Sequence, residues 1–98
     1  MREQQAILKA NISNYGEYSS NNYGAHTLKV ELGARTFYFS YETLVAFKGE
    51  NSKGVWFNCV HQNIWGRTTG KHLNWINPNK DKRVDEQEFQ KQLKEFMK

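Results

Sequence analysis

The sequence has 98 residues, of which 38% are hydrophobic and 14% aromatic, and its formal net charge is +4 at pH 7. This length fits one domain over residues 1–98 and excludes a second. The aromatic content excludes a disordered chain, and no apolar run approaches the roughly 20 residues of a membrane span. A single cysteine excludes an intrachain disulfide framework. We therefore expect a soluble, cytoplasmic, single-domain protein without membrane association.

The first clear element is a β-hairpin. Apolar and polar side chains alternate in residues 27–32 and again in residues 35–41. The pair Gly33-Ala34 between them favours a type II′ turn, because glycine at the first turn position accepts a positive φ. We expect two antiparallel strands joined at this pair.

Further strands flank this hairpin in the sequence. Residues 43–48 and 55–61 are β-prone, and residues 5–12 are apolar enough for one element, either a strand or a short helix. Residues 13–24 consist mainly of Ser, Asn, Gly and Tyr, which predicts a long loop or an irregular edge. The pattern predicts an antiparallel sheet of four to five strands.

The C-terminus predicts a helix. Asp85 and Glu88 have the spacing of a capping box, and Val84 and Phe89 that of a hydrophobic staple. The apolar positions inside the helix follow a helical spacing and form one stripe: Phe89, Leu93, Phe96 and Met97. We expect an α+β fold with this helix packed on one face of the sheet. The side chains expected to meet the helix are Leu28, Val30, Phe37 and Phe39.

The positive charge is concentrated in residues 53–83. This stretch has six basic residues against one acidic residue and contains all three tryptophans, whereas residues 1–52 are balanced and residues 84–98 have a net charge of −1. Cations interleaved with large aromatics suit a surface that holds phosphates and stacks on bases. The alternative is that the tryptophans are core residues and the lysines form a solvated rim. The expected binding residues are Trp65, Arg67, Lys71, His72, Lys80, Lys82 and Arg83.

The segment from Gly66 to His72 has some features of a phosphate-binding loop. It has three residues between its glycines where that loop needs four, and His72 stands where a Ser or Thr would bind magnesium. We therefore do not expect nucleotide hydrolysis. We expect residues 68–74 to form a structured loop with Arg67 and Lys71 exposed at its rim, and such a turn would also suit one anion.

No metal or cofactor is expected. Residues 77–88 match several ligand positions of a calcium-binding loop, but Lys82 replaces its required glycine. Cys59 and His61 share a face of a predicted strand, so a Cys–His pair stays open, as does acid–base chemistry at His61 or His72. The sequence does not place a matching nucleophile, acid or base with either histidine. The sequence therefore leaves enzymatic activity uncertain and favours a binding protein.

Three stretches of this sequence resemble a family of small phage and prophage proteins of unknown function. The stretches are Tyr15-Gly16-x-Tyr18-x-Ser20-x-x-Tyr23-Gly24-Ala25-His26, Phe39-Ser40-Tyr41-x-Thr43-x-Val45-Ala46-Phe47 and Asn63-x-Trp65-Gly66-x-Thr68-Thr69-Gly70-Lys71-His72-Leu73-Asn74. The resemblance spans residues 11–89, and its most specific part runs from Trp65 to Asn74. The resemblance implies a mobile-element setting in a host cell cytoplasm and carries over no catalytic residues.

Two functions follow as expectations. The first is a non-enzymatic binding module for an anionic partner surface, such as a host defence nucleoprotein complex, which it would inhibit. The alternative is an accessory protein that binds nucleic acid directly, with Trp65 or Trp75 stacking on bases.

Overall fold

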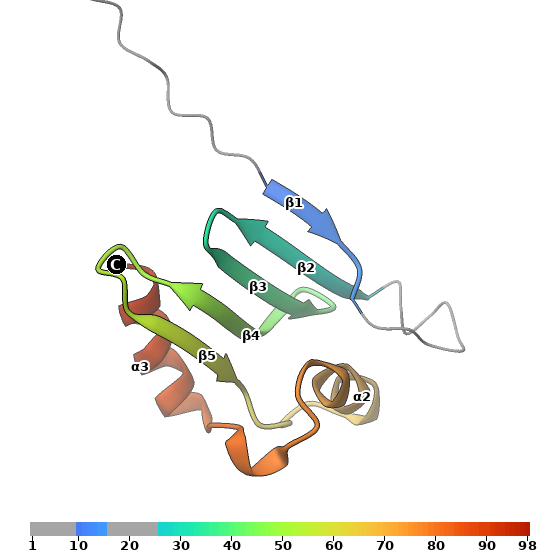
Figure 1. Ribbon diagram of the computed structural model, residues 1–98. Coiled ribbons are helices and arrows are strands. Elements are labelled where there is room, and N and C mark those ends of the chain that lie inside the picture. Colours follow the sequence, from blue (N-terminus) through green and yellow to red (C-terminus); the bar gives the residue numbers. More distant parts are fainter. Residues whose placement is uncertain (1–9, 16–25) are drawn as a thin grey trace, which may run out of the picture.

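The computed structural model, drawn in Figure 1, describes residues 10–15 and 26–98 of the chain. Within them lies one five-stranded antiparallel sheet in which each strand pairs with its neighbours in the sequence. The strands are β1 (Ala10–Ser13), β2 (Thr27–Leu32), β3 (Arg35–Ser40), β4 (Thr43–Glu50) and β5 (Trp56–Val60). The predicted α+β fold and sheet are confirmed. Most of the expected tyrosine-rich loop, from residue 16 onward, lies outside the described residues.

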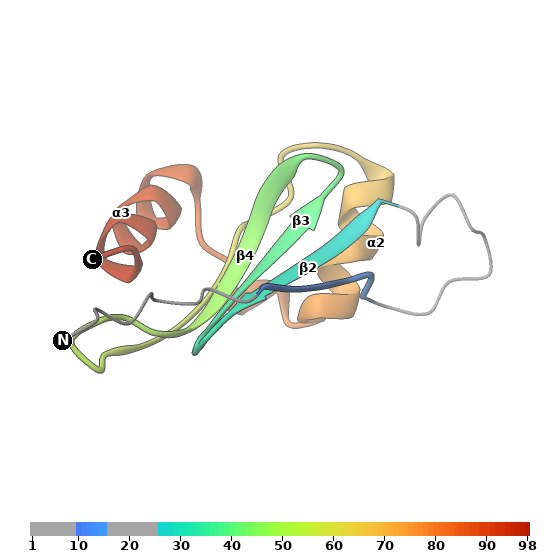
Figure 2. The ribbon, with the colours of Figure 1, turned by 90° about the horizontal axis from the view of Figure 1, so that it is seen from above.

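Two α-helices cover opposite faces of this sheet, as Figure 2 shows. They are α2 (Arg67–Ile76) and α3 (Glu86–Phe96), and a short 3₁₀ helix, η1 (Lys80–Lys82), lies between them in the chain. The expectation of a loop over residues 68–74 is wrong, because these residues form most of α2. No helix in the described part of the chain combines the length and the apolar character that a membrane span requires.

The hairpin turns hold the strands in register. Gly33 has a φ of 59°, the sign that the predicted turn requires. Gly49 has a φ of 129°, and a Cβ atom there would lie 1.9 Å from the carbonyl oxygen of Ala34, in the turn directly before β3. Only glycine therefore allows β3 and β4 to approach this closely. The pairing of β3 with β4 also shifts next to Tyr38, which leaves Val45 as an extra residue in β4.

The first core lies between α3 and one face of the sheet. Its ring contacts centre on Phe96, which is fully buried, with ring centroids 4.7 Å from Phe47 and 5.5 Å from Phe37. The helix begins as predicted, because the Asp85 side chain accepts a hydrogen bond from the backbone N–H of Glu88 at 2.9 Å. The packing of α3 on this face therefore holds β5 and the chain that follows it in place.

The residues that meet α3 differ in part from the expected ones. Phe37 packs against this core as predicted. The other three expected sheet residues, Leu28, Val30 and Phe39, are half-buried and lie outside the cluster. The cause is the position of the helix, which packs on β3, β4 and β5 and not on β2.

The second core was not predicted, because the alternation in residues 35–41 puts Tyr38 on the side of the strand opposite Phe37 and Phe39. Tyr38 packs with Tyr15, Val60 and Leu73 beneath α2, on the face opposite α3. The Tyr15 hydroxyl also donates a hydrogen bond to the carbonyl oxygen of Phe39 at 2.9 Å. The sheet is therefore buried on both sides at its β3–β5 end, and the second core positions α2.

Candidate anion-binding site

The helix α2 presents three faces, because side chains four residues apart share a side of a helix. Thr69, His72 and Leu73 are buried against the sheet. Gly70 and Asn74 lie on the next face, and the outermost face displays a row with helical spacing: Arg67, Lys71 and Trp75. Sequence reasoning missed the helix but placed Arg67 and Lys71 correctly at the surface, where both are exposed.

His72, one of the expected binding residues, is part of the core. It is fully buried, and its Nδ1 lies 2.7 Å from the Ser40 hydroxyl oxygen, which in turn lies 2.9 Å from the Thr69 hydroxyl oxygen. This buried polar network fastens α2 to the end of β3. The side chain of His72 consequently has no surface to offer a partner.

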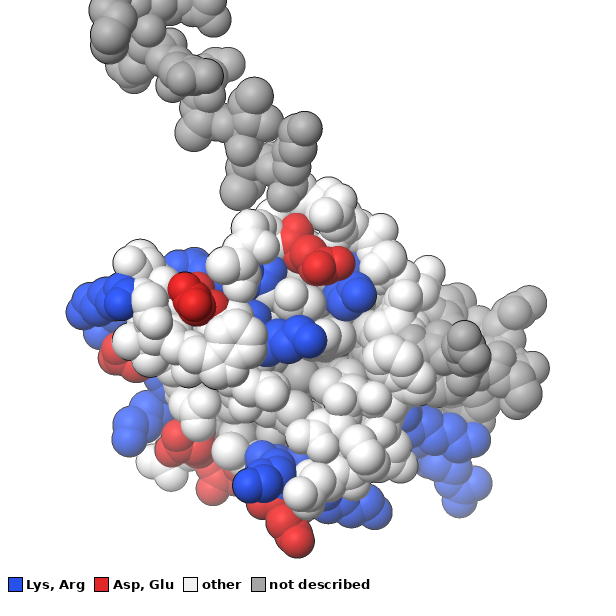
Figure 3. Space-filling view, viewed as in Figure 1, with Lys and Arg blue, Asp and Glu red and all other residues white. Residues whose placement is uncertain are grey.

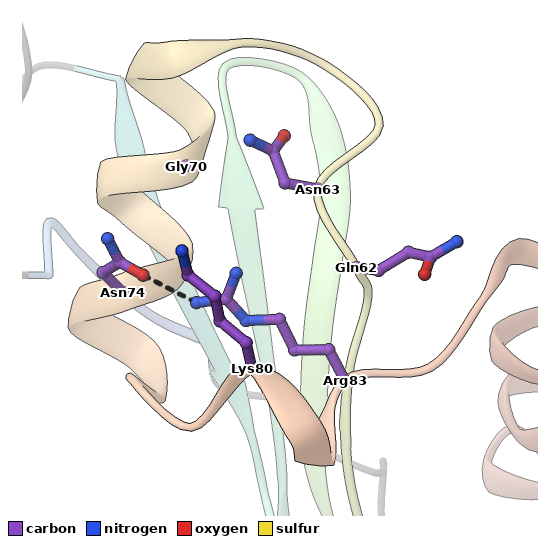
Figure 4. Close-up of a pocket in the computed structure, with 6 residues that line it drawn as sticks. All are labelled: Gln62, Asn63, Gly70, Asn74, Lys80 and Arg83. Carbon is purple, nitrogen blue, oxygen red and sulfur yellow. Dashed lines mark hydrogen bonds between the residues drawn. The ribbon is translucent and has the colours of Figure 1, made fainter.

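A hollow of about 320 Å³ lies between α2 and η1, and we call it the α2–η1 hollow. Figure 4 shows its lining side chains. The hollow brings together two of the expected basic residues with four polar or small residues that the sequence did not single out: Gln62, Asn63, Gly70, Asn74, Lys80 and Arg83. None of the described residues that line it is acidic.

Arg83 is held in a fixed orientation at this hollow. Its Nη2 donates hydrogen bonds to the Asn74 side-chain oxygen at 2.8 Å and to the Asn77 backbone oxygen at 3.1 Å. Its Nε is buried and has no hydrogen-bond partner in the structure. Burial also lowers the pKa of the Arg83 guanidinium, although an arginine stays charged at neutral pH. An anion in the hollow would offset this burial of charge.

Side-chain amides shape the rest of the hollow. Asn63 accepts a hydrogen bond from the backbone N–H of Trp65 and donates one to the carbonyl oxygen of Gly66, both at 3.0 Å. A Cβ atom at Gly70 would come within 2.9 Å of the Asn63 side-chain nitrogen. Glycine at position 70 therefore lets Asn63 lie against the helix and sets the width of the hollow.

Two asparagines position η1. The side-chain oxygen of Asn77 accepts from the N–H of Asn79 at 3.0 Å, and that of Asn79 accepts from the N–H of Asp81 at 3.1 Å. These oxygens stabilise turns, which accounts for the apparent calcium-loop spacing. In the described residues no group of three His, Cys, Asp or Glu side chains is placed to hold a metal ion.

The basic residues of the segment 53–83 do not all gather in one place. Lys53 lies in the turn between β4 and β5, at the end of the sheet away from α2. The other five lie on α2, on η1 or directly after it: Arg67, Lys71, Lys80, Lys82 and Arg83. In Figure 3, blue side chains predominate along the lower edge, over η1 and α2, whereas blue and red alternate elsewhere on this face.

Trp65 and Trp75 are more exposed than core residues would be, which was the alternative interpretation of the sequence. Trp65 is 40% exposed, and its ring centroid lies 4.8 Å from that of His61, so it is partly tied to the core. Trp75 is 51% exposed on α2, and its ring centroid lies 6.0 Å from that of the buried Tyr15. The sequence named both rings as candidates for stacking on bases, and Trp75 is the more exposed of the two.

Cys59 and His61 are structural groups. Burial raises the pKa of the Cys59 thiol to about 12, and the Glu88 carboxylate adds to this shift. The two ring nitrogens of His61 lie 2.7 Å from the Gln62 carbonyl oxygen and 2.6 Å from the Glu86 carboxylate. His61 thus fastens the end of β5 to the first turn of α3, and the hydrogen bond holds the pKa of the Glu86 carboxyl below its usual value.

Comparison with known proteins identifies the family. A model described as a family of unknown function (DUF8033) matches residues 4–91. The chain belongs to this family. No curated protein and no solved structure matches the chain. Membership of the DUF8033 family thus agrees with the resemblance to proteins of unknown function, and the function has to be argued from the site itself.

Proposed function

We propose that this DUF8033 protein is a non-enzymatic binding module that engages an anionic partner surface through α2 and η1. The observation that carries the proposal is the gathering of five basic residues on these two helices and at Arg83, while Asp81 is the only acidic residue between positions 62 and 83. The burial of Cys59, His61 and His72 supports binding over catalysis, because a nucleophile or a general base must reach its substrate.

A nucleoprotein complex would suit such a surface, because it offers both phosphates and acidic side chains. The resemblance to small phage and prophage proteins supports this choice of partner. We therefore propose a host defence nucleoprotein complex as the partner, with the protein acting as an inhibitor in the host cell cytoplasm.

Direct nucleic-acid binding is the second candidate, and the exposed Trp75 ring favours it. Trp75 lies one helical turn beyond Lys71 on the outer face of α2, and an exposed aromatic ring next to cations is the arrangement on which single-stranded bases stack. In that case the protein would bind oligonucleotides without any protein partner.

The double variant Arg67→Ala/Lys71→Ala tests both candidates. We expect it to weaken capture of the partner from a host lysate, measured with the immobilised protein before and after nuclease treatment. If the partner is nucleic acid alone, the logarithm of affinity for duplex should fall against the logarithm of salt with a slope of about −0.9 per contact, and the variant should flatten that slope by two contacts.

The matched control is Lys91→Ala/Lys94→Ala, which removes the same charge from exposed positions on α3. This control should bind like the parent protein. The proposal fails if the parent binds no oligonucleotide and both double variants capture the same partners as the parent.

A further inference from the structure

We propose that the α2–η1 hollow is a binding site for a phosphate monoester group. The inference rests on the proposed function, since it names the chemistry of the anionic partner at one place on its surface. It draws on the charges, the fixed geometry and the size of the hollow.

The charges at the hollow favour a dianion. Figure 4 shows the side chains of Lys80 and Arg83 both extending toward α2, with a terminal nitrogen of Arg83 bonded to Asn74. Two cations without an acidic lining residue match a phosphate monoester, which carries a charge of about −1.5 to −2 at neutral pH. A carboxylate, with one charge and two oxygens, would leave part of this positive charge unmatched.

The orientation of Arg83 is set before any ligand arrives. Hydrogen bonds to Asn74 and Asn77 fix the plane of the guanidinium. Both bonds use Nη2, so Nη1 is the guanidinium nitrogen that remains to donate to a phosphate oxygen, and a donor held in place loses little entropy on binding. The Nε has no partner, but it is buried and is not accessible to a ligand in the hollow.

The size of the hollow suits an esterified phosphate. A volume of about 320 Å³ is at the small end of ligand pockets and leaves room for the atoms attached to a phosphate. Trp75, the residue after Asn74, projects about 100° further around α2, and its ring centroid lies 6.0 Å from that of Tyr15, so this ring does not belong to the hollow.

The test is a titration of the full chain, followed by its backbone and side-chain amide NMR signals, at constant ionic strength. The probes are inorganic phosphate, adenosine monophosphate, O-phosphoserine and acetate. We expect phosphate and both of its esters to shift the signals of Gly70 and Asn74, and acetate not to. Equal shifts with acetate would overturn the phosphate assignment. The relative affinities of adenosine monophosphate and O-phosphoserine distinguish the two sources of the ester.

Two lysines of η1 provide a matched pair. Lys80 lines the hollow, whereas Lys82 is exposed on the same short helix and does not line it. Lys80→Gln should weaken phosphate binding about tenfold, as expected for one charge-assisted hydrogen bond, while Lys82→Gln should leave it nearly unchanged. Equal losses in both variants would indicate attraction by the general positive charge and would refute a site.

Arg83→Lys gives a second variant that keeps the charge and removes the planar group held by Asn74 and Asn77. We expect it to lose phosphate binding, with its melting temperature measured alongside, and unchanged binding would count against a role for the fixed guanidinium. Loss of partner capture in Arg67→Ala/Lys71→Ala without phosphate binding by the parent would refute the phosphate site alone. Phosphate binding with unaffected capture would instead refute the proposed function.

Discussion

Tyr41, in the turn between β3 and β4, has a backbone conformation that residues with a Cβ rarely adopt. Its φ is 58°, and its N–H donates to the carbonyl oxygen of His26 at 2.8 Å, while the two rings stack with centroids 4.2 Å apart. The left-handed region costs residues other than glycine about 1–2 kcal/mol. The two-residue turn and the stacked ring hold Tyr41 there against this cost.

We expect Tyr41→Gly to be more stable than Tyr41→Ala by about 1 kcal/mol, because both lose the ring and only glycine relieves the backbone. Chemical denaturation of the two variants measures this difference. Equal stabilities would mean that the turn relaxes out of the left-handed region once the ring is gone.

The buried thiol of Cys59 predicts a loss of stability in alkaline solution. Its pKa rises from an ordinary value of 9.0 to about 12 in the folded chain, so the unfolded chain releases the proton first. Its contribution is therefore fully present below pH 9.0 and is lost as the pH rises toward 12. The free energy of unfolding should fall more steeply above pH 9 in the parent than in Cys59→Ala. Parallel curves would assign the alkaline loss to other groups.

At the scale of elements, α3 depends on one ring. Phe96 is fully buried and touches the rings of Phe37, Phe47 and Phe57 from three strands. Phe96→Ala should lower the free energy of unfolding by about 3–5 kcal/mol, because it removes a large side chain and leaves a cavity. Denaturant titration checks this value, with Met97→Ala, at an exposed position next to it, as the control expected to cost less than about 0.5 kcal/mol. A small loss at Phe96 would mean that α3 does not rely on this contact.

The two helices also differ in how far the sequence predicts them. The start of α3 is marked by the Asp85 cap, and its stripe is made of large apolar residues. The segment of α2 has Gly66 at its N-cap, with no side-chain hydrogen bond, and Gly70 in its interior. Its buried side includes Thr69 and His72, which a search for apolar periodicity does not count. Their burial depends on Ser40, a partner distant in sequence, so local reasoning had no access to it.

At the scale of the whole molecule, the sequence located the site only to a stretch of residues. Charge counting indicated the segment 53–83, and Lys80 and Arg83 from that segment do line the hollow. The same count included Lys53, which the hairpin places at the other end of the sheet. Neutral Asn74 was invisible to charge counting, because its role of orienting Arg83 arises only when α2 and η1 meet.

The burial of both faces of the sheet determines where this chain tolerates insertions and deletions. Ala46 and Phe47 are neighbours in β4, yet one packs in the core under α2 and the other in the core under α3. Losing one residue after the extra Val45 would reverse this alternation and turn a phenylalanine toward α2. Length differences among members of the DUF8033 family should therefore fall in the connections between elements and not within β4.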